Sequence, residues 1–178
     1  MRSPKHLLIW LIVIAVAAAV AELTQVFRAP PSEPPKATGG VIAGRARVVD
    51  GDSLIVGLAR IRLFGIDAPE REQDCRNAAG GTYACGREAT RALTSAIAGR
   101  AVTCTPVDHD RYDRDVAVCT AEGDDLGEAM VRSGHALDLA RHSRRRYADA
   151  ERDARDARRG LWAGSFDTPA VWRRQQAN

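Results

Sequence analysis

Alternating apolar and polar positions predict a run of short β-strands from residue 41 onward. The first strand is Val41–Val49, and Leu54–Leu58 and Ile61–Ile66 follow it as a hairpin. After a loop rich in glycine, asparagine and cysteine, Ala101–Thr105 and Asp115–Thr120 continue the pattern. Five strands of this length are enough to close a small barrel.

Three other segments repeat apolar residues every three or four positions, which is typical of helices. Arg87–Ala98 is the first, and a second helix ends at Ser133 after an acidic turn, Glu122–Asp125, that can cap its start. The third is Tyr147–Leu161. We therefore expect an α+β domain. The pattern alone fits both a five-stranded barrel and an open sheet with helices on one side.

The first forty residues have a different composition. Arg2 and Lys5 precede an apolar run, Leu7–Ala21, that ends in an Ala-x-Ala-like cleavage site. As a helix this run would rise only ~22 Å, short of the ~30 Å hydrocarbon core of a membrane, so we expect cleavage and export. The alternative is an uncleaved anchor with membrane contact through residues 7–21. The expected parts are a signal peptide (1–21), a Pro/Gly-rich linker (22–40), the folded domain (41–165) and a C-terminal tail (166–178).

Net charge adds little to this picture. The chain has 26 basic and 23 acidic residues. Because Arg2 and Lys5 lie in the leader, 24 basic side chains face 23 acidic ones in the remainder. Overall charge therefore does not indicate nucleic-acid binding, and any such attraction must come from local clustering.

Four cysteines suit an exported protein in an oxidising compartment. Three pairings are possible. We expect Cys75–Cys85, which closes a short loop, and Cys104–Cys119, which joins two neighbouring strands. A zinc site is the competing hypothesis, but the sequence has no Cys-x-x-Cys and its spacings are wide.

Carboxylates and arginines gather at the ends of the predicted strands. Asp52 follows a turn, Asp67 ends the third strand, and Glu70 comes directly after Pro69. Carboxylates of this kind can hold a hard cation such as calcium, and arginine binds phosphate through two parallel hydrogen bonds. Taken singly, each residue also has a plain structural explanation as a turn or surface residue.

The joint pattern is more specific and resembles the staphylococcal nuclease (thermonuclease) family from about Val41 to Trp162. The matching motifs are Asp50-Gly51-Asp52-Ser53, Arg62-Leu63-Phe64-Gly65-Ile66-Asp67-Ala68-Pro69-Glu70, Asp110-Arg111-Tyr112-Asp113-Arg114 and Gly160-Leu161-Trp162. The resemblance implies a five-stranded OB-type β-barrel with three α-helices. It also implies hydrolysis of phosphodiester bonds in DNA and RNA, with 3′-phosphate products and little sequence specificity.

The same resemblance assigns roles to individual residues. Asp52 and Asp67 would coordinate one Ca²⁺ with the backbone carbonyl of Ala68. Glu70 would orient or deprotonate the attacking water. The scissile phosphate would be held by Arg62 and Arg114, and the nucleotide by Tyr112.

The chain also departs from the family at four positions. Ala68 replaces a threonine, Asp113 replaces a glycine, and Leu139 and His142 replace tyrosines of the nucleotide pocket. We expect an exported, monomeric, calcium-dependent nuclease with DNA and RNA as substrates. The alternatives are a catalytically silent OB-type nucleic-acid-binding module and a membrane-tethered envelope interaction domain.

Overall fold

Five strands form the centre of the fold in the computed structural model, which describes residues 38–177. The expected signal peptide lies outside these residues. Strand order in the sheet is β3-β2-β1-β7-β8, and a short strand β9 extends it beyond β8. The bounds are β1 Ile42–Val48, β2 Ser53–Val56, β3 Ala59–Leu63, β7 Ala101–His109, β8 Asp115–Ala121 and β9 Asp124–Asp125.

A parallel pairing closes this sheet into a barrel. Ile61 on β3 lies opposite Asp115 on β8, and every other pairing among the five strands is antiparallel. β1 and β2 meet at the expected turn, where Val48 lies opposite Leu54. The predicted five-stranded OB-type barrel is therefore confirmed, and the open sheet is excluded.

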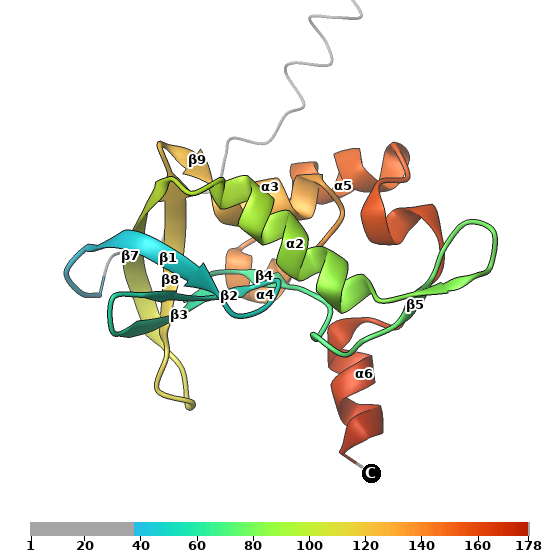
Figure 1. The fold of residues 1–178 in the computed structure, drawn as a ribbon, viewed down its shortest axis with the longest axis horizontal. Helices are drawn as coiled ribbons and strands as arrows, with labels where there is room; N and C mark the ends of the chain where they lie inside the picture. The colour runs from blue at the N-terminus through green and yellow to red at the C-terminus, as the bar shows by residue number, and fades with distance from the viewer. Residues whose placement is uncertain (1–37, 178) are drawn as a thin grey trace, which may run out of the picture. The chain divides into compact units, whose positions relative to one another are not determined.

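The three expected helices are present as α2, α3 and α5. Helix α2 buries Cys85, Ala89, Leu93 and Ile97, one residue per turn, against the barrel. Asp125 caps α3 by accepting a hydrogen bond from the amide of Glu128. In Figure 1 these helices lie beside the barrel. The described chain also contains α4, α6 and a 3₁₀ turn, η1. The helical bounds are α2 Cys85–Ile97, α3 Leu126–Arg132, α4 Ala140–Ser143, α5 Ala148–Asp156, η1 Gly160–Ala163 and α6 Pro169–Gln176.

Two expected elements are shorter than their sequence patterns. The helix expected to reach Leu161 ends at Asp156, because the chain turns back through a left-handed conformation at Arg158 (φ 51°), and Gly160 (φ 52°) continues the turn into η1. A side chain at Gly160 would meet the carbonyl oxygen of Gly134 at 2.4 Å, so this contact requires glycine. The strand expected to reach Ile66 stops at Leu63. The remaining short strands are β4 Ile66–Asp67, β5 Cys75–Arg76, β6 Thr82–Tyr83 and β10 Leu137–Asp138, and β4 pairs with β10.

The core joins the inside of the barrel to the inner faces of the helices. Burial of these apolar side chains is the main force that fixes the strands and so the turns between them. Its fully buried members include Leu54, Ile61, Leu63, Leu93, Val102, Leu126, Met130, Val131 and Tyr147. Within residues 38–177 no helix has the length and apolar character needed to cross a membrane.

Both expected disulfides form. Cys104–Cys119 joins β7 to β8 inside the barrel, and Cys75–Cys85 joins the loop after Glu70 to the first turn of α2. No cysteine in the described chain is left free, so the zinc hypothesis fails. The two disulfides indicate folding in an oxidising, extracytoplasmic compartment.

Candidate active site

A pocket of about 700 Å³ opens at one end of the barrel, beside the turn between β1 and β2. The hairpin of β2 and β3, the segment after β4 and the loop between β7 and β8 form its walls. Of the seven residues assigned to the site by sequence, Asp67 alone is absent from the lining. Those that line it are Asp52, Arg62, Ala68, Glu70, Tyr112 and Arg114.

Asp52, Arg62 and Asp67 form what we call the floor of the pocket. The guanidinium of Arg62 donates to Asp52 Oδ1 at 2.8 Å and to Asp67 Oδ1 at 3.1 Å. Asp67 is almost fully buried behind it. Arg62 thus holds two carboxylates from different segments of the chain. Asp52 lies directly before β2, and Asp67 lies on β4.

Asp52 is further fixed by its neighbours. Its Oδ1 accepts a hydrogen bond from the Ser53 hydroxyl at 3.0 Å, and its Oδ2 accepts one from the Ala68 amide at 3.2 Å. Burial nevertheless raises the pKa of Asp52 to about 6, and the nearby charges of Asp50 and Asp67 add to the rise, while Arg62 opposes it. Loss of contact with water is therefore the main cause of the raised pKa, and the attraction of Arg62 offsets it only in part.

Gly51 explains how the turn reaches the floor. A Cβ at this position would lie 2.6 Å from the Cβ of Ala68 and 2.7 Å from the Cβ of Ala89. Only glycine allows the turn to pack this closely between β4 and α2. The Asp-Gly-Asp sequence is thus more than a hairpin turn, because its glycine brings Asp52 against the Ala68 amide.

Arg114 enters the pocket from the β7–β8 loop with its direction fixed by Asp110. Its Nε donates to Asp110 Oδ2 at 2.8 Å, and its Nη1 donates to the Ser53 hydroxyl at 3.3 Å. Asp113, the acidic residue directly before Arg114, contacts His109 at 3.1 Å. Asp113 has a φ of 60°, which explains why glycine suits this position in the family.

Tyr112 is exposed at the mouth of the pocket. Its ring lies 4.9 Å from the guanidinium carbon of Arg111 and 5.5 Å from that of Arg114. Leu139 and His142 also line the pocket, at the place where the resemblance implies tyrosines. The aromatic surface available to a base is therefore smaller than in the family pattern.

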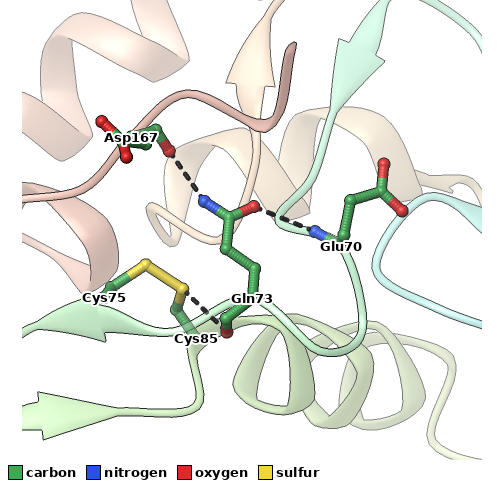
Figure 2. Close-up of a disulfide and its surroundings, with 5 residues drawn as sticks. All are labelled: Glu70, Gln73, Cys75, Cys85 and Asp167. Atoms are coloured by element: carbon green, nitrogen blue, oxygen red, sulfur yellow. Dashed lines mark hydrogen bonds between the residues drawn. A yellow bond between two sulfur atoms is a disulfide. The ribbon is translucent and has the colours of Figure 1, made fainter. Parts of the chain in front are cut away.

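Glu70 is placed by a buried glutamine that sequence analysis did not identify. The Oε1 of Gln73 accepts a hydrogen bond from the Glu70 amide at 3.2 Å, and its Nε2 donates to the carbonyl of Asp167 at 2.7 Å. Figure 2 shows Gln73 between these partners, with Cys85 Sγ 3.4 Å from its carbonyl oxygen. The Cys75–Cys85 disulfide thus packs against the turn that carries Glu70.

Arg173 is the second residue that sequence analysis did not identify. It lies on α6, within the expected tail, and its side chain reaches the pocket. Its Nη1 donates to Glu70 Oε1 at 2.6 Å, and its two terminal nitrogens contact both oxygens of Asp67 at 3.1 and 3.0 Å. Thr168-Pro169, an N-cap residue followed by a first-turn proline, was the signal that could have predicted this helix.

The oxygen atoms at the floor of the pocket are ligands of the type that a hard cation prefers. Asp52, Asp67 and the carbonyl of Ala68 offer oxygen ligands, which calcium prefers. No group of three acidic, histidine or cysteine side chains in the described chain is close enough to form a metal cluster. A calcium ion here would therefore take its remaining ligands from water and backbone carbonyls.

A family model described as "Staphylococcal nuclease homologue" matches residues 60–164. The matched region includes Arg62, Asp67, Glu70 and Arg114. It ends before α6, so Arg173 lies outside it.

Curated relatives agree with this match. The succinoglycan biosynthesis protein ExoI of Rhizobium meliloti (strain 1021) is 34% identical over 149 residues, 83% of this chain and 74% of that protein. An uncharacterized endonuclease of Escherichia coli is 34% identical over 143 residues, covering 76% of this chain and 87% of the relative. The probable staphylococcal-like nuclease CAN3 of Oryza sativa subsp. japonica is 35% identical over 129 residues, 71% of this chain but 32% of the rice protein. Together with the closed barrel, these matches lead to the conclusion that the chain belongs to the staphylococcal nuclease family.

Proposed function

We propose that this protein is an exported, monomeric, calcium-dependent nuclease that hydrolyses phosphodiester bonds in DNA and RNA with little sequence specificity. Family membership and the relatives named as nucleases support hydrolase activity. The observation that carries the proposal is the arrangement of the pocket. Arg62, Arg114 and Glu70 line one cavity together with the buried Asp52, and the buried Asp67 lies beside it.

The two arginines are the proposed phosphate ligands. Hydrolysis of a phosphodiester concentrates negative charge on the oxygens of the five-coordinate phosphorus, and preorganised cations stabilise that charge. Arg62 is held by the floor carboxylates and Arg114 by Asp110, so both guanidinium groups are oriented before substrate arrives. Their planar geometry allows two hydrogen bonds to one phosphate, which lysine cannot reproduce.

Glu70 is the proposed acceptor of a proton from the attacking water. It lies at the pocket wall with its backbone fixed by Gln73. General-base assistance of this kind typically contributes ~10²–10⁴-fold to a rate. A Ca²⁺ ion held by Asp52, Asp67 and the Ala68 carbonyl would supply Lewis-acid polarisation of a phosphoryl oxygen.

Tyr112 is the proposed contact for the sugar or base of the nucleotide. Its exposed ring offers a stacking surface that accepts any base, which agrees with low sequence specificity. We further propose that residues 1–21 form the export signal, residues 22–40 a tether, and residues 41–165 the nuclease domain.

Digestion of plasmid DNA and single-stranded RNA by the full-length chain tests the proposal. We expect cutting with calcium, no cutting with EGTA, and loss of cutting in Asp52→Asn. Asp156→Asn is the matched control, because Asp156 is exposed on α5 outside the pocket. Calcium-independent cutting would overturn the metal assignment. Binding of single strands without cutting at any pH between ~7 and ~10 would favour the silent OB-type module.

A further inference from the structure

The C-terminal helix α6 carries a cation into the site where the proposed calcium would bind. Arg173 contacts both side-chain oxygens of Asp67 and one oxygen of Glu70. Asp67 also accepts from Arg62, so its carboxylate is shared between two guanidinium groups. An internal positive charge therefore occupies the space between a proposed metal ligand and the proposed general base.

The segment before α6 is fastened to the loop that follows Glu70. Gln73 donates to the carbonyl of Asp167, and Arg76 and Ser165 exchange two backbone hydrogen bonds at 2.9 and 3.0 Å. Thr168 caps α6 by accepting from the amide of Val171. These contacts fix the start of α6 and so direct the side chain of Arg173 toward the pocket.

The attachment leaves α6 itself only partly buried. Pro169 is the one fully buried residue of the helix, and the Arg173 side chain is 43% exposed, against 3% for Asp67. Water can therefore solvate Arg173 as soon as it leaves the pocket, whereas the buried carboxylate of Asp67 then loses one of its two cationic partners. This difference in burial favours replacement of Arg173 by another cation over simple opening of α6.

We propose that α6 is an autoinhibitory latch in which Arg173 occupies the place of the catalytic cation, and that calcium binding displaces it. The latch rests on the proposed calcium-dependent function. With Arg173 in place, neither oxygen of Asp67 is available to a metal, and Glu70 is held by an ion pair. Displacement of Arg173 frees Asp67 Oδ2 and Glu70 at once, while Arg62 keeps its bond to Asp67 Oδ1, and this couples metal binding to activation of the general base.

Calcium titration of the full-length chain by isothermal calorimetry, without nucleic acid, tests the latch. When α6 must open before calcium binds, the apparent affinity equals the affinity of the open state multiplied by the fraction of molecules that are open. We expect Arg173→Gln to bind calcium about tenfold more tightly than the unmodified chain, which corresponds to an open fraction of about one in ten. Arg174→Gln is the matched control, because it removes the same charge from an exposed neighbour on α6.

Hydrogen exchange supplies a readout of the helix itself. We expect amides of residues 170–176 to exchange faster when calcium is added to the unmodified chain, while amides of β7 and β8 stay protected. Equal calcium affinity in the two variants, or unchanged exchange in α6, would overturn the latch and leave the calcium site intact. Absence of calcium binding in all three proteins would overturn the calcium site and the latch together.

Discussion

The floor of the pocket and its rim are built from different parts of the fold. The floor (Asp52, Arg62 and Asp67) sits on or beside barrel strands, and its carboxylates are buried. The rim, by which we mean Glu70, Tyr112 and Arg173, sits on two loops and the C-terminal helix. These side chains are between about a third and a half exposed.

The difference separates two tasks. Strand pairing fixes the backbone of the floor, so these three side chains cannot move apart without disturbing the strands. Hydrogen bonds from Gln73 and one disulfide hold the rim's glutamate, and these contacts can rearrange while the barrel stays intact. The fixed floor therefore binds the charge of the phosphate, and the adjustable rim controls substrate access and proton transfer.

Loss of Arg62 should have the largest effect on activity. We expect Arg62→Gln to lower kcat by ~10²–10³-fold, because it removes a preorganised cation from the transition state, and Arg62→Lys not to restore it. Steady-state cleavage of a DNA substrate measures the effect, with circular dichroism to check folding. Arg47→Gln, on the exposed side of β1, is the control. A near-normal rate in Arg62→Gln would remove the floor from the mechanism.

The two disulfides should separate stability from activity. Each closes a loop of similar length, with sequence separations of 15 and 10. Replacing either pair by alanine should therefore lower the free energy of unfolding by about 3 kcal/mol. The variant lacking Cys104–Cys119 should keep its activity per folded molecule, because that bond lies in the barrel core.

The variant lacking Cys75–Cys85 should instead lose activity per folded molecule, because that bond packs against the turn that carries Glu70. Urea denaturation and kcat, measured on both double variants, test this contrast. Equal kcat in the two variants would contradict the distinction between floor and rim.

The pH dependence of stability should reveal the buried charge of the floor. The pKa of Asp52 is about 6 in the folded chain and 3.8 for an ordinary aspartate, so the folded state binds this proton more tightly. The free energy of unfolding should therefore fall as pH rises from about 4 to about 6, by on the order of 2–3 kcal/mol.

Urea denaturation with EGTA present measures this slope, and Asp52→Asn should flatten it. The charged groups around Asp52 are Arg62, Asp50 and Asp67. Asp156→Asn should keep the original slope. Identical pH profiles for Asp52→Asn and the unmodified chain would mean that Asp52 is not the buried charge of the floor.

The sequence pattern predicted the five strands because they are short, alternating and locally defined, whereas the closed barrel was predicted by the family resemblance. It also placed Asp52, Arg62 and Asp67 at strand ends, where a closed sheet brings distant residues together. Their mutual contacts could not be predicted from spacing, since they depend on the close approach that Gly51 permits.

The rim was harder to predict because it depends on contacts between distant segments. Gln73 contacts Asp167, 94 positions along the chain, and nothing near Gln73 indicates that it is buried. Arg173 lies in a short helix whose apolar residues are consecutive, Pro169–Trp172, so it lacks the periodic pattern by which the other helices were found. Thr168-Pro169 predicts the helix but not its contact with Asp67.

Tyr112 offers the smallest expected effect and the most direct test of the rim as a substrate contact. Stacking of one base on an aromatic ring is worth ~1–3 kcal/mol, so Tyr112→Ala should raise KM about tenfold with kcat nearly unchanged. Tyr112→Phe should leave both constants within about twofold, because it keeps the ring and removes only the hydroxyl that accepts from Arg111. Leu58→Ala is the control, since Leu58 is fully exposed outside the pocket. A fall in kcat in Tyr112→Ala without a change in KM would mean that Tyr112 positions the neighbouring arginines of the pocket and does not hold the nucleotide.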